Sequence, residues 1–572
     1  MNYDVAIVGG GPAGSTVGTL LKKYDPSLKV AIFERERFPR EHVGESQLPR
    51  IGQILDEMGV WEKVEAANFP IKIGATYRWG SSPELWDFEF ISPAEFVDEA
   101  RPAPLSARRK RTAFQVDRAI YDKILLDHAA SVGCEVREST AVKAVESSND
   151  RVSAWVLADG EQIVARHYVD ASGGAGILRR SLNVEVDIPS SLQNVAFWDY
   201  WENAEWAVHI GVGGTQVQVL SLGYGWIWFI PLGPTRTSIG LIVPVEYYKR
   251  SGLSPNDIYH KAIQEEPRVR ALIANATPEG EVHRTRDWSF VAKRMAGENW
   301  FLAGESCGFA DPILAAGMTL AHVGAQEVAY TILELDRGEH DPEWLRRRYE
   351  EAQTKRIRQH VRFADFWYSA NGQFTELKEF CADLAAEEGL EMDADTAFQW
   401  LGTGGFLNDK FATAGLGEYS LSAVKRLTER MTATPATWGI NRFNEFRLDL
   451  VGARKEEFPM FAEGRIIKQR GYARAGKSLP YAGMCKLVVA SLQHEHRMDR
   501  IFEFARTSLR STRGVTNVDE ALVQFATTLE AMLTEGWVKG RVNRKAPFLS
   551  FGRADGASGP PRKEETHRGT AR

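Results

Sequence analysis

The sequence has few cysteines, no long hydrophobic run and no large excess of one charge. Its four cysteines are scattered along 572 residues, without the paired or clustered spacing of disulfide frameworks and zinc sites. No uninterrupted apolar run is long enough to cross a bilayer, and a net charge of −6 gives no general attraction to nucleic acid or anionic membrane. A strand-like run already begins at residue 3, which leaves no room for a signal peptide. We therefore expect a cytoplasmic, metal-free protein with no nucleic-acid or membrane partner.

What the chain does contain is the alternation of apolar runs and helical segments that is typical of an α/β fold. Residues 4–8 form an apolar run that ends in glycines, residues 13–24 predict a helix, and residues 29–34 predict the next strand. This βαβ order indicates a buried, Rossmann-like parallel sheet. Residues 141–168 alternate between hairpin turn signals and predict a small antiparallel meander.

The domain organisation follows from where these patterns change. We expect residues 1–340 to form one module, with a second, aromatic-rich sheet inserted at about 185–290. Residues 341–551 predict a mainly helical C-terminal region. Residues 552–572 are rich in Gly, Pro, Arg, Lys and Glu and predict a disordered tail.

A glycine-rich loop between the first strand and the first helix predicts a dinucleotide site. The loop residues are Gly9, Gly11, Pro12, Ala13 and Gly14. The G-x-G-x-x-G spacing allows a tight turn, close approach of a pyrophosphate to the backbone, and close packing of helix on strand. The free amides of the helix start attract phosphate. Glu34, at the end of the second strand, stands where an acid binds ribose hydroxyls.

Two further motifs resemble those of the FAD proteins related to glutathione reductase and the aromatic hydroxylases. Val116-Asp117-Arg118 starts a helix whose arginine, in that class, faces the flavin phosphates or ribityl chain. The segment 304–312 resembles the second flavin motif of the class, with Glu305 in place of the usual aspartate. Because the chain has a single dinucleotide fingerprint, we assign it to FAD and expect electrons from a separate flavin reductase.

The full set of motifs resembles the flavin-dependent halogenases. Residues 226–231 have the pattern W-x-W-x-I-P, which in that family separates halogenases from ordinary flavin monooxygenases. Phe38-Pro39-Arg40 followed by Val43-Gly44-Glu45-Ser46 also resembles the family, and the likeness covers about residues 3–335. Beyond the glycine loop, the flavin contacts that it implies are Arg40, Ser46, Arg118, Glu305, Pro312 and Met318.

The resemblance also implies roles at the reaction centre. Lys72 matches the lysine that relays hypohalous acid to the substrate, either as an ammonium that polarises it or as a neutral amine that traps it. Trp226 and Trp228 share a face of a strand and would form a wall between substrate and flavin. The backbone amides of Ala316 and Gly317 would hold chloride or bromide. The alternatives are a solvated loop lysine and an ordinary aromatic strand.

The resemblance also implies a role for one residue outside these motifs, Asp287. Some members of the family attach flavin covalently through an aspartate in the neighbourhood of Asp287. A surface or helix-capping aspartate is the alternative interpretation of this residue.

Departures from the family pattern narrow the expected substrate. Ala316 replaces the usual threonine or serine, and Leu314 and Ala315 replace a Glu-Ser pair found in tryptophan-specific members. We therefore expect a small electron-rich aromatic substrate of the phenol, pyrrole or indole type, free or tethered to a carrier protein. A flavin monooxygenase on the same fold and a non-catalytic flavin-binding protein remain as alternatives.

Overall fold

The computed structural model describes residues 3–381, 438–550 and 562–563, apart from short gaps at 98, 107, 190–192, 212, 288, 476 and 513–516. The chain divides into two compact units. The first contains residues 1–391 and 461–466, and the second contains residues 392–460 and 467–572. The division falls near residue 391 rather than 340, because the long helix α10 (Pro342–Ser369) packs on α9 (Gly317–Arg337) in the first unit. Apart from 562–563, the predicted tail lies outside the described residues.

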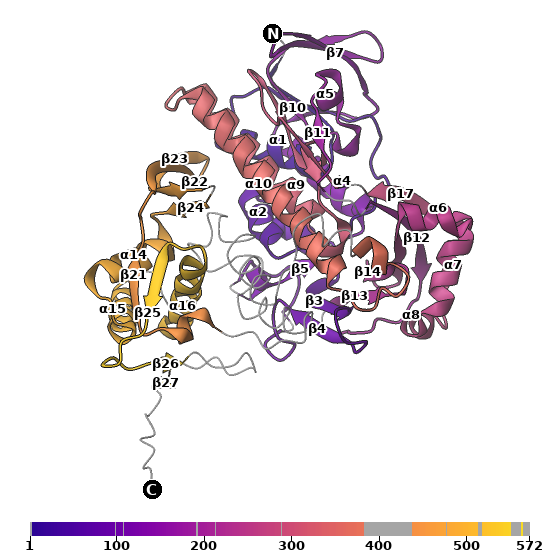
Figure 1. The fold of residues 1–572 in the computed structure, drawn as a ribbon. Coiled ribbons are helices and arrows are strands. Elements are labelled where there is room, and N and C mark those ends of the chain that lie inside the picture. Colours follow the sequence, from indigo (N-terminus) through magenta and orange to yellow (C-terminus); the bar gives the residue numbers. More distant parts are fainter. Residues whose placement is uncertain are drawn as a thin grey trace. The chain divides into compact units, whose positions relative to one another are not determined.

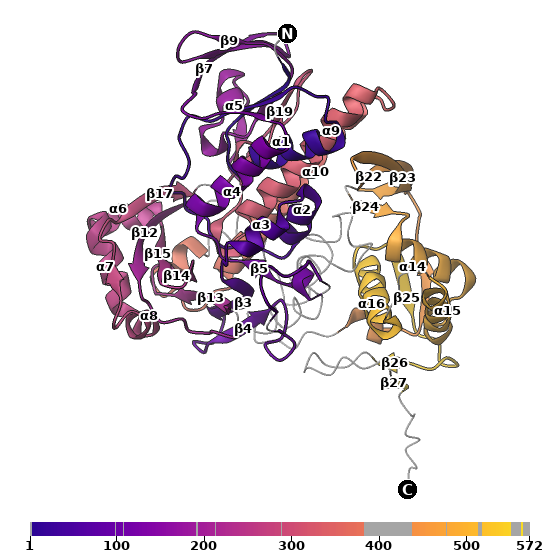
Figure 2. The same ribbon diagram turned by 180° about the vertical axis from the view of Figure 1, so that it is seen from behind.

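The first unit contains a parallel five-stranded sheet in the order β19-β10-β1-β2-β6; β10 is labelled in Figure 1 and β19 in Figure 2. Its strands are β1 (Tyr3–Val8), β2 (Val30–Phe33), β6 (Glu135–Arg137), β10 (Ala165–Asp170) and β19 (Trp300–Leu302). Helix α1 (Pro12–Tyr24) joins β1 to β2 and packs against α9 and against α4 (Arg118–Ser131). All of β2 is buried, as expected for a parallel sheet covered on both faces. The predicted meander is present as β7 (Val142–Ser148), β8 (Arg151–Leu157) and β9 (Gln162–Ile163).

The second sheet of this unit has nine strands. The main path runs β16-β12-β15-β14-β13-β3-β4, with β17 beside β12 and β5 beside β3. Its strands are β3 (Ile71–Arg78), β4 (Trp86–Glu89), β5 (Ala113–Phe114), β12 (Asn194–Glu202), β13 (Gly214–Ser221), β14 (Trp226–Pro231), β15 (Arg236–Pro244), β16 (Thr277–Pro278) and β17 (His283–Asp287). The expected span of 185–290 therefore supplies only part of the sheet, because β3, β4 and β5 from residues 71–114 complete it.

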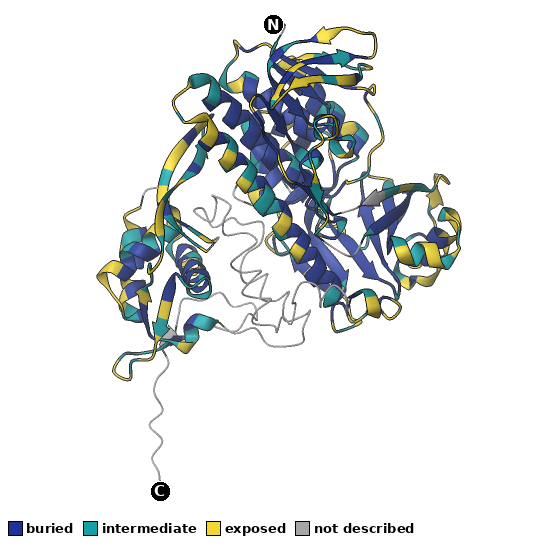
Figure 3. Ribbon diagram, turned by 45° about the horizontal axis from the view of Figure 1, so that its top comes forward, coloured by how far each residue is buried: buried dark blue, intermediate teal, exposed yellow. Residues whose placement is uncertain are grey.

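One face of the nine-stranded sheet is covered by helices. Phe229, Ile239 and Leu241 pack with Ile258 and Tyr259 of α7 (Pro255–Glu265), next to α8 (Pro267–Leu272). Figure 3 shows the strands of this sheet as largely buried, while the outer sides of α7 and α8 are exposed. The opposite face therefore carries the side chains that can take part in a site.

An irregularity in β3 decides where Lys72 points. Lys72 pairs with Thr215 and Gly74 pairs with Gln216, so Ile73 is an extra residue opposite the β13 backbone. Without this bulge, Lys72 would share a face with Gly74. The extra residue reverses the alternation, so that Lys72 and Gly74 lie on opposite faces.

The same register places the two motif tryptophans beside the lysine. Along β13, alternate residues share one face. Thr215, the partner of Lys72, therefore lies on the same face as Val219 and Ser221. Val219 pairs with Trp228, and Ser221 pairs with Trp226. Lys72, Trp226 and Trp228 consequently lie on one face of the sheet, opposite the helix-covered core.

Shorter elements connect these parts. The first unit also contains α2 (Arg50–Met58), α3 (Trp61–Ala66), α5 (Ile177–Ser181), α6 (Val245–Ser251), and a small sheet of β11 (Val186–Asp187), β18 (Phe290–Ala292) and β20 (Gly308–Phe309). Turns of 3-10 helix lie at Arg109–Arg111, Gly173–Ala175, Gly304–Ser306 and Pro312–Leu314 in this unit, and at Gly439–Arg442 in the second unit.

The second unit mixes helices and strands around its own apolar core. Strand β21 (Glu445–Leu448) pairs with β25 (Val538–Arg541). Strands β22 (Arg454–Ala462), β23 (Arg465–Arg474) and β24 (Lys477–Pro480) form a three-stranded sheet, of which residues 461–466 are counted in the first unit. The helices are α14 (Gly483–His494), α15 (Met498–Arg510) and α16 (Val518–Thr534), and β26 (Leu549–Ser550) pairs with β27 (Arg562–Lys563). The sequence predicted mainly helix here, because the many charged residues of β22 and β23 conceal their period of two.

Candidate functional site

The glycine-rich loop lies at the carboxyl end of β1, where a dinucleotide site is expected. Gly9 has a φ of +101°, and a Cβ atom on Gly14 would lie 1.9 Å from the carbonyl oxygen of Gly9. A Cβ atom on Gly11 would meet nothing closer than Arg40 Nη2, at 3.4 Å. The fold therefore requires glycine at positions 9 and 14, whereas at position 11 the missing side chain leaves space outside the backbone. Gly11 is the N-cap residue of α1 and offers no side-chain cap, so the first free amides of the helix are available to a ligand.

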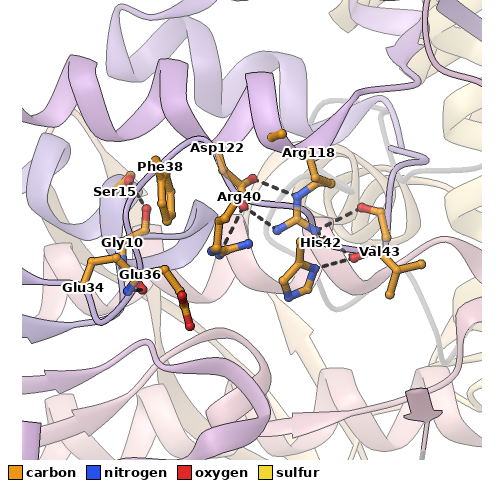
Figure 4. Close-up of polar contacts among 12 residues, drawn as sticks. Gly10, Ser15, Glu34, Glu36, Phe38, Arg40, His42, Val43, Arg118 and Asp122 are labelled. Atoms are coloured by element: carbon orange, nitrogen blue, oxygen red, sulfur yellow. Dashed lines mark hydrogen bonds and ion pairs between the residues drawn. The ribbon is translucent and has the colours of Figure 1, made fainter. Parts of the chain in front are cut away.

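Glu34 supports this loop from the end of β2. One carboxylate oxygen accepts a hydrogen bond from the backbone N–H of Gly10 at 2.7 Å, and the other accepts from the N–H of Glu36 at 2.9 Å (Figure 4). The carboxylate is buried. The residue predicted to bind ribose thus also holds the glycine loop in place.

Two arginines converge beside the loop on one carboxylate, that of Asp122 (Figure 4). Arg118 makes two parallel bonds to Asp122, at 2.8 and 2.9 Å, and donates to the carbonyls of Val43 and Gly44. Arg40 approaches the same carboxylate at 3.4 Å, and its buried Nη1 has no protein partner. Two guanidinium groups thus share one carboxylate, and the buried Nη1 of Arg40 is left as a donor that a phosphate oxygen can satisfy.

Gln115 is a flavin-site candidate that sequence reasoning missed. It is 0% exposed, and neither its Nε2 nor its Oε1 has a hydrogen-bond partner. A buried amide without partners is costly unless a ligand or water satisfies it. It directly precedes the Val116-Asp117-Arg118 motif and pairs through its backbone with Ser46. Together with the partnerless Arg40 nitrogen and the glycine cradle, this orphaned amide fits the polar groups of a bound FAD.

Lys72 is a buried strand residue and not a solvated loop lysine. It is 2% exposed, and its Nζ atom donates to Ser46 Oγ at 2.8 Å and to the carbonyl of Gln47 at 3.0 Å. The Phe90 ring lies 5.3 Å from Nζ. Burial lowers the pKa of Lys72 from 10.5 to about 7. The amine can therefore exist in either protonation state near neutral pH.

Glu45, the neighbour of Ser46 in the chain, is a second buried titratable residue, and no role is predicted for it from the sequence. It adjoins Ser46, and one of its carboxylate oxygens accepts a hydrogen bond from the Tyr200 hydroxyl at 3.2 Å. Burial raises the pKa of Glu45 to about 7, although Tyr200 and Arg118 oppose the shift. Its place in the Val-Gly-Glu-Ser segment was the available signal, but burial of this carboxylate depends on tertiary contacts.

The two tryptophans of the W-x-W motif form a continuous aromatic surface on β14. Their ring centroids are 6.2 Å apart, and both side chains are buried. The indole N–H of Trp228 donates to Ser238 Oγ at 3.0 Å, and its ring covers Gly240, where a Cβ atom would lie 2.1 Å from the ring. Glycine on the neighbouring strand thus makes room for this ring.

The predicted halide turn lies between Asp311 and α9. Asp311 accepts a hydrogen bond from the backbone N–H of Ile313 at 2.8 Å and so fixes the 3-10 turn at Pro312–Leu314. Ala315 has a left-handed φ of 52°, Ala316 precedes the helix without a side-chain cap, and α9 begins at Gly317. The amides of Ala316 and Gly317 thus lie at an uncapped start of a long helix, as an anion site requires.

This turn is connected to both the lysine and the flavin residues. Gln47, whose carbonyl accepts from Lys72, places its amide nitrogen 3.9 Å from the sulfur of Met318. A Cβ atom on Gly317 would lie 4.0 Å from a carboxylate oxygen of Glu305. Burial raises the pKa of Glu305, while Arg118 opposes the shift. The predicted lysine, halide and flavin residues therefore belong to one connected region.

Two predicted features are only partly described. Asp287 ends β17, and its backbone pairs with Asn194, but its side chain lies outside the described residues, as does that of Leu314.

Among the residues that the structure describes, no group of three metal-ligating side chains occurs. None of the helices in the described ranges is long and apolar enough to cross a membrane.

Comparison with known proteins identifies the family. The family model described as an FAD binding domain matches residues 2–364. The chain is 33% identical over 345 residues to a tryptophan 2-halogenase of Chondromyces crocatus, covering 59% of this chain and 62% of that protein. It is 30% identical over 393 residues to a 1H-pyrrole-2-carbonyl peptidyl-carrier protein chlorinase of Pseudomonas fluorescens, covering 65% and 85% respectively. The matched region thus spans less than two thirds of the first of these relatives.

Solved structures agree with the sequence relatives. The flavin-dependent halogenase CmlS superposes over 97% of this chain and 98% of its own, with a TM-score of 0.71 and 23% identity, and so shares the fold. The myxobacterial chondrochloren halogenase CndH superposes over 76% of this chain and 98% of its own, with a TM-score of 0.58 and 25% identity. The chain belongs to the flavin-dependent halogenase family, and it is an FAD-dependent enzyme.

Proposed function

We propose that this chain oxidises chloride or bromide to hypohalous acid and that Lys72 delivers the halogen to an electron-rich aromatic substrate. Bound in its reduced form, FAD supplies two electrons to dioxygen, so that one oxygen atom enters hypohalous acid and the other leaves as water. The observation that carries the proposal is the buried Lys72 amine, held on the same sheet face as Trp226 and Trp228.

Lys72 suits the handling of a small oxidant because its amine is both buried and held in a fixed direction. Two acceptors, Ser46 Oγ and the Gln47 carbonyl, orient Nζ and leave one hydrogen of the ammonium for a ligand. With a pKa lowered to about 7, the same group is also available as a neutral amine that attacks the halogen. Burial of the amine supports halogen delivery both by the ammonium and by the neutral amine. The pH dependence of the halogenation rate distinguishes these two routes.

The tryptophan wall supports halogenation over direct hydroxylation. Both rings lie on the Lys72 face and are fixed by hydrogen bonds from their indole nitrogens. A substrate excluded by this wall cannot contact the flavin and must receive the halogen through the lysine. The uncapped amides of Ala316 and Gly317 support halide binding at the start of α9.

The partners are inferred from the same features. A single dinucleotide fingerprint supports a separate flavin reductase as the source of electrons. The apolar Ala315 and Ala316 support a phenol-, pyrrole- or indole-type ring, free or carrier-tethered. Covalent attachment of flavin at Asp287 stays a prediction, which mass spectrometry of the denatured protein tests directly.

The proposed function is tested by turnover with a flavin reductase, NADH, FAD and a panel of aromatic compounds, with and without bromide. A product whose mass carries bromine, formed only when bromide is present, is the expected result. A hydroxylated product that forms equally well without halide identifies a monooxygenase instead. Flavin binding with no product from any compound favours a non-catalytic flavin protein. Steady NADH oxidation without added reductase contradicts the assignment of the single fingerprint to FAD.

A further inference from the structure

A buried hydrogen-bond network joins the tryptophan wall to the halide turn. The hydroxyl of Tyr368, near the end of α10, donates to Asp311 Oδ1 at 2.9 Å. The same hydroxyl accepts from the indole N–H of Trp226 at 3.1 Å and from the Asn194 amide at 3.3 Å. The Asn194 amide also donates to Asp311 Oδ2 at 3.0 Å. All four side chains are at most 5% exposed.

The chemistry of these groups determines the direction of each bond. An indole nitrogen only donates, and the two oxygens of the Asp311 carboxyl group already accept N–H groups, from Ile313 and from Asn194. The tyrosine hydroxyl therefore accepts from Trp226 and donates to Asp311. Burial raises the pKa of Asp311 to about 7, although the hydrogen bonds from Ile313, Tyr368 and Asn194 oppose the shift. Phenylalanine at position 368 would leave both the indole and the carboxyl group without this partner. In a buried site, a carboxylate or N–H group that loses its partner either moves or bears the full cost of desolvation.

Asp311 is the point at which this network reaches the turn. Its Oδ1 atom accepts both the Tyr368 hydroxyl and the backbone N–H of Ile313. That second bond fixes the 3-10 turn whose next residues are Ala315, Ala316 and Gly317. A shift of the Asp311 carboxylate would therefore displace the two amides that are proposed to bind halide.

We propose that Tyr368 is a positioning residue that holds the halide turn against the tryptophan wall and so tunes halide affinity from a helix outside the turn. The inference rests on the proposed function, since it requires that the turn binds halide. Trp226 then has two roles, because the same indole that shields the flavin also anchors the carboxylate that shapes the turn. Asn194 holds the second oxygen of that carboxylate.

The test titrates FAD-loaded, oxidised protein with sodium bromide and follows the flavin absorbance spectrum, so that no turnover is needed. Tyr368→Phe is expected to raise the bromide Kd roughly tenfold, with FAD affinity unchanged, since it removes one hydrogen bond to the buried carboxyl group of Asp311. Trp226→Phe is expected to raise it less, because the Tyr368–Asp311 bond remains. The double variant is expected to show less than the sum of the two effects, as coupled partners do.

Tyr349→Phe is the matched control. Tyr349 lies on the same helix and is buried, but its hydroxyl contacts Leu302 and Cys307 rather than the halide turn. Its bromide Kd is expected to equal that of the unmodified protein. A bromide Kd in Tyr368→Phe equal to that of the parent, with FAD retained, overturns the inference.

If Tyr368→Phe fails to retain FAD, a second variant provides the test. In that case, an unchanged bromide Kd in Trp226→Phe overturns the inference, because the indole donor is one arm of the same network. If the unmodified FAD-loaded protein gives no bromide response up to molar salt, the proposed halide site itself is wrong. The two failures are therefore distinguishable.

Discussion

Lys72 and Ser46 lie 26 positions apart in the chain, yet the Nζ atom of Lys72 is 2.8 Å from the Ser46 hydroxyl oxygen. The contact joins the nine-stranded sheet to the segment that follows strand β2 of the parallel sheet. Ser46 is predicted to touch the flavin, so one hydrogen bond separates the proposed flavin contact from the proposed halogen carrier. A change at the lysine should therefore affect halogen transfer while leaving the flavin loop and its supports intact.

Replacing Lys72 by methionine is expected to abolish halogenation while FAD content and dioxygen consumption stay within about twofold of the parent. Methionine has a similar length and suits a buried site, but it can neither donate to hypohalous acid nor trap it. Product, hydrogen peroxide and dioxygen are measured together, with Lys293→Met as a control for loss of a lysine at the surface. Halogenated product from Lys72→Met at the parent rate would remove Lys72 from the mechanism.

The same substitution has an expected effect on stability that depends on pH. Burial lowers the folded-state pKa of Lys72 from 10.5 to about 7, so the unfolded chain binds one more proton between those values. Unfolding free energy rises with pH wherever the unfolded state binds more protons, so this destabilisation is complete below pH 7 and fades toward pH 10.5. Lys72→Met should therefore raise Tm by roughly 5 °C at pH 7, with a smaller gain at pH 9.5. A gain that does not vary with pH would contradict the lowered pKa.

Gly11→Ala and Gly14→Ala are expected to have different effects, the first on FAD binding and the second on the stability of the apoprotein. The Gly14 Cβ atom would collide with the Gly9 carbonyl, whereas the Gly11 Cβ atom would meet no protein atom closer than 3.4 Å. Gly14→Ala should therefore lower the thermal stability of the apoprotein, while Gly11→Ala should fold normally and bind FAD at least roughly tenfold more weakly. Apoprotein Tm and FAD Kd from fluorescence quenching separate the two effects. Equal FAD affinity in Gly11→Ala and the parent would show that the pyrophosphate lies elsewhere.

The local features of the fold could be predicted because they depend on neighbouring residues. The strand–glycine–helix order at residues 4–24, the meander after residue 141 and the strand that carries Trp226 all follow from periodicity and turn residues. The existence of the parallel sheet followed from the same evidence. These elements are specified within windows of about 20 residues or fewer, which is the range over which sequence patterns act.

The arrangement across the sheet could not be predicted, because it depends on register between distant strands. The bulge at Ile73 decides the face on which Lys72 lies, and it is visible only when β3 is paired with β13. Burial of Glu45 and Gln115, and the reach of Tyr368 from α10 to Asp311, likewise depend on contacts between segments far apart in the chain. Motif resemblance supplied candidate residues, but physical contacts between them come only from the tertiary structure.

Substrate choice gives the final prediction, and it depends on the halide turn. A free amino acid has a carboxylate and an ammonium group, and each needs a partner when it is buried. Ala315 and Ala316 supply no polar side chain at this turn, and the wall formed by Trp226 and Trp228 is aromatic. A flat, uncharged or carrier-tethered ring should therefore bind with less desolvation than tryptophan. We expect kcat/KM for at least one phenol-, pyrrole- or indole-type compound to exceed that for free tryptophan by roughly tenfold or more.

The comparison uses one reductase system, bromide at saturation, and both free rings and rings tethered to a carrier domain. One of the relatives is named a tryptophan 2-halogenase, so tryptophan is the decisive competitor in the panel. If tryptophan gives the highest kcat/KM, other groups must satisfy its charges, and the interpretation of this turn is wrong while the halogenase assignment stands.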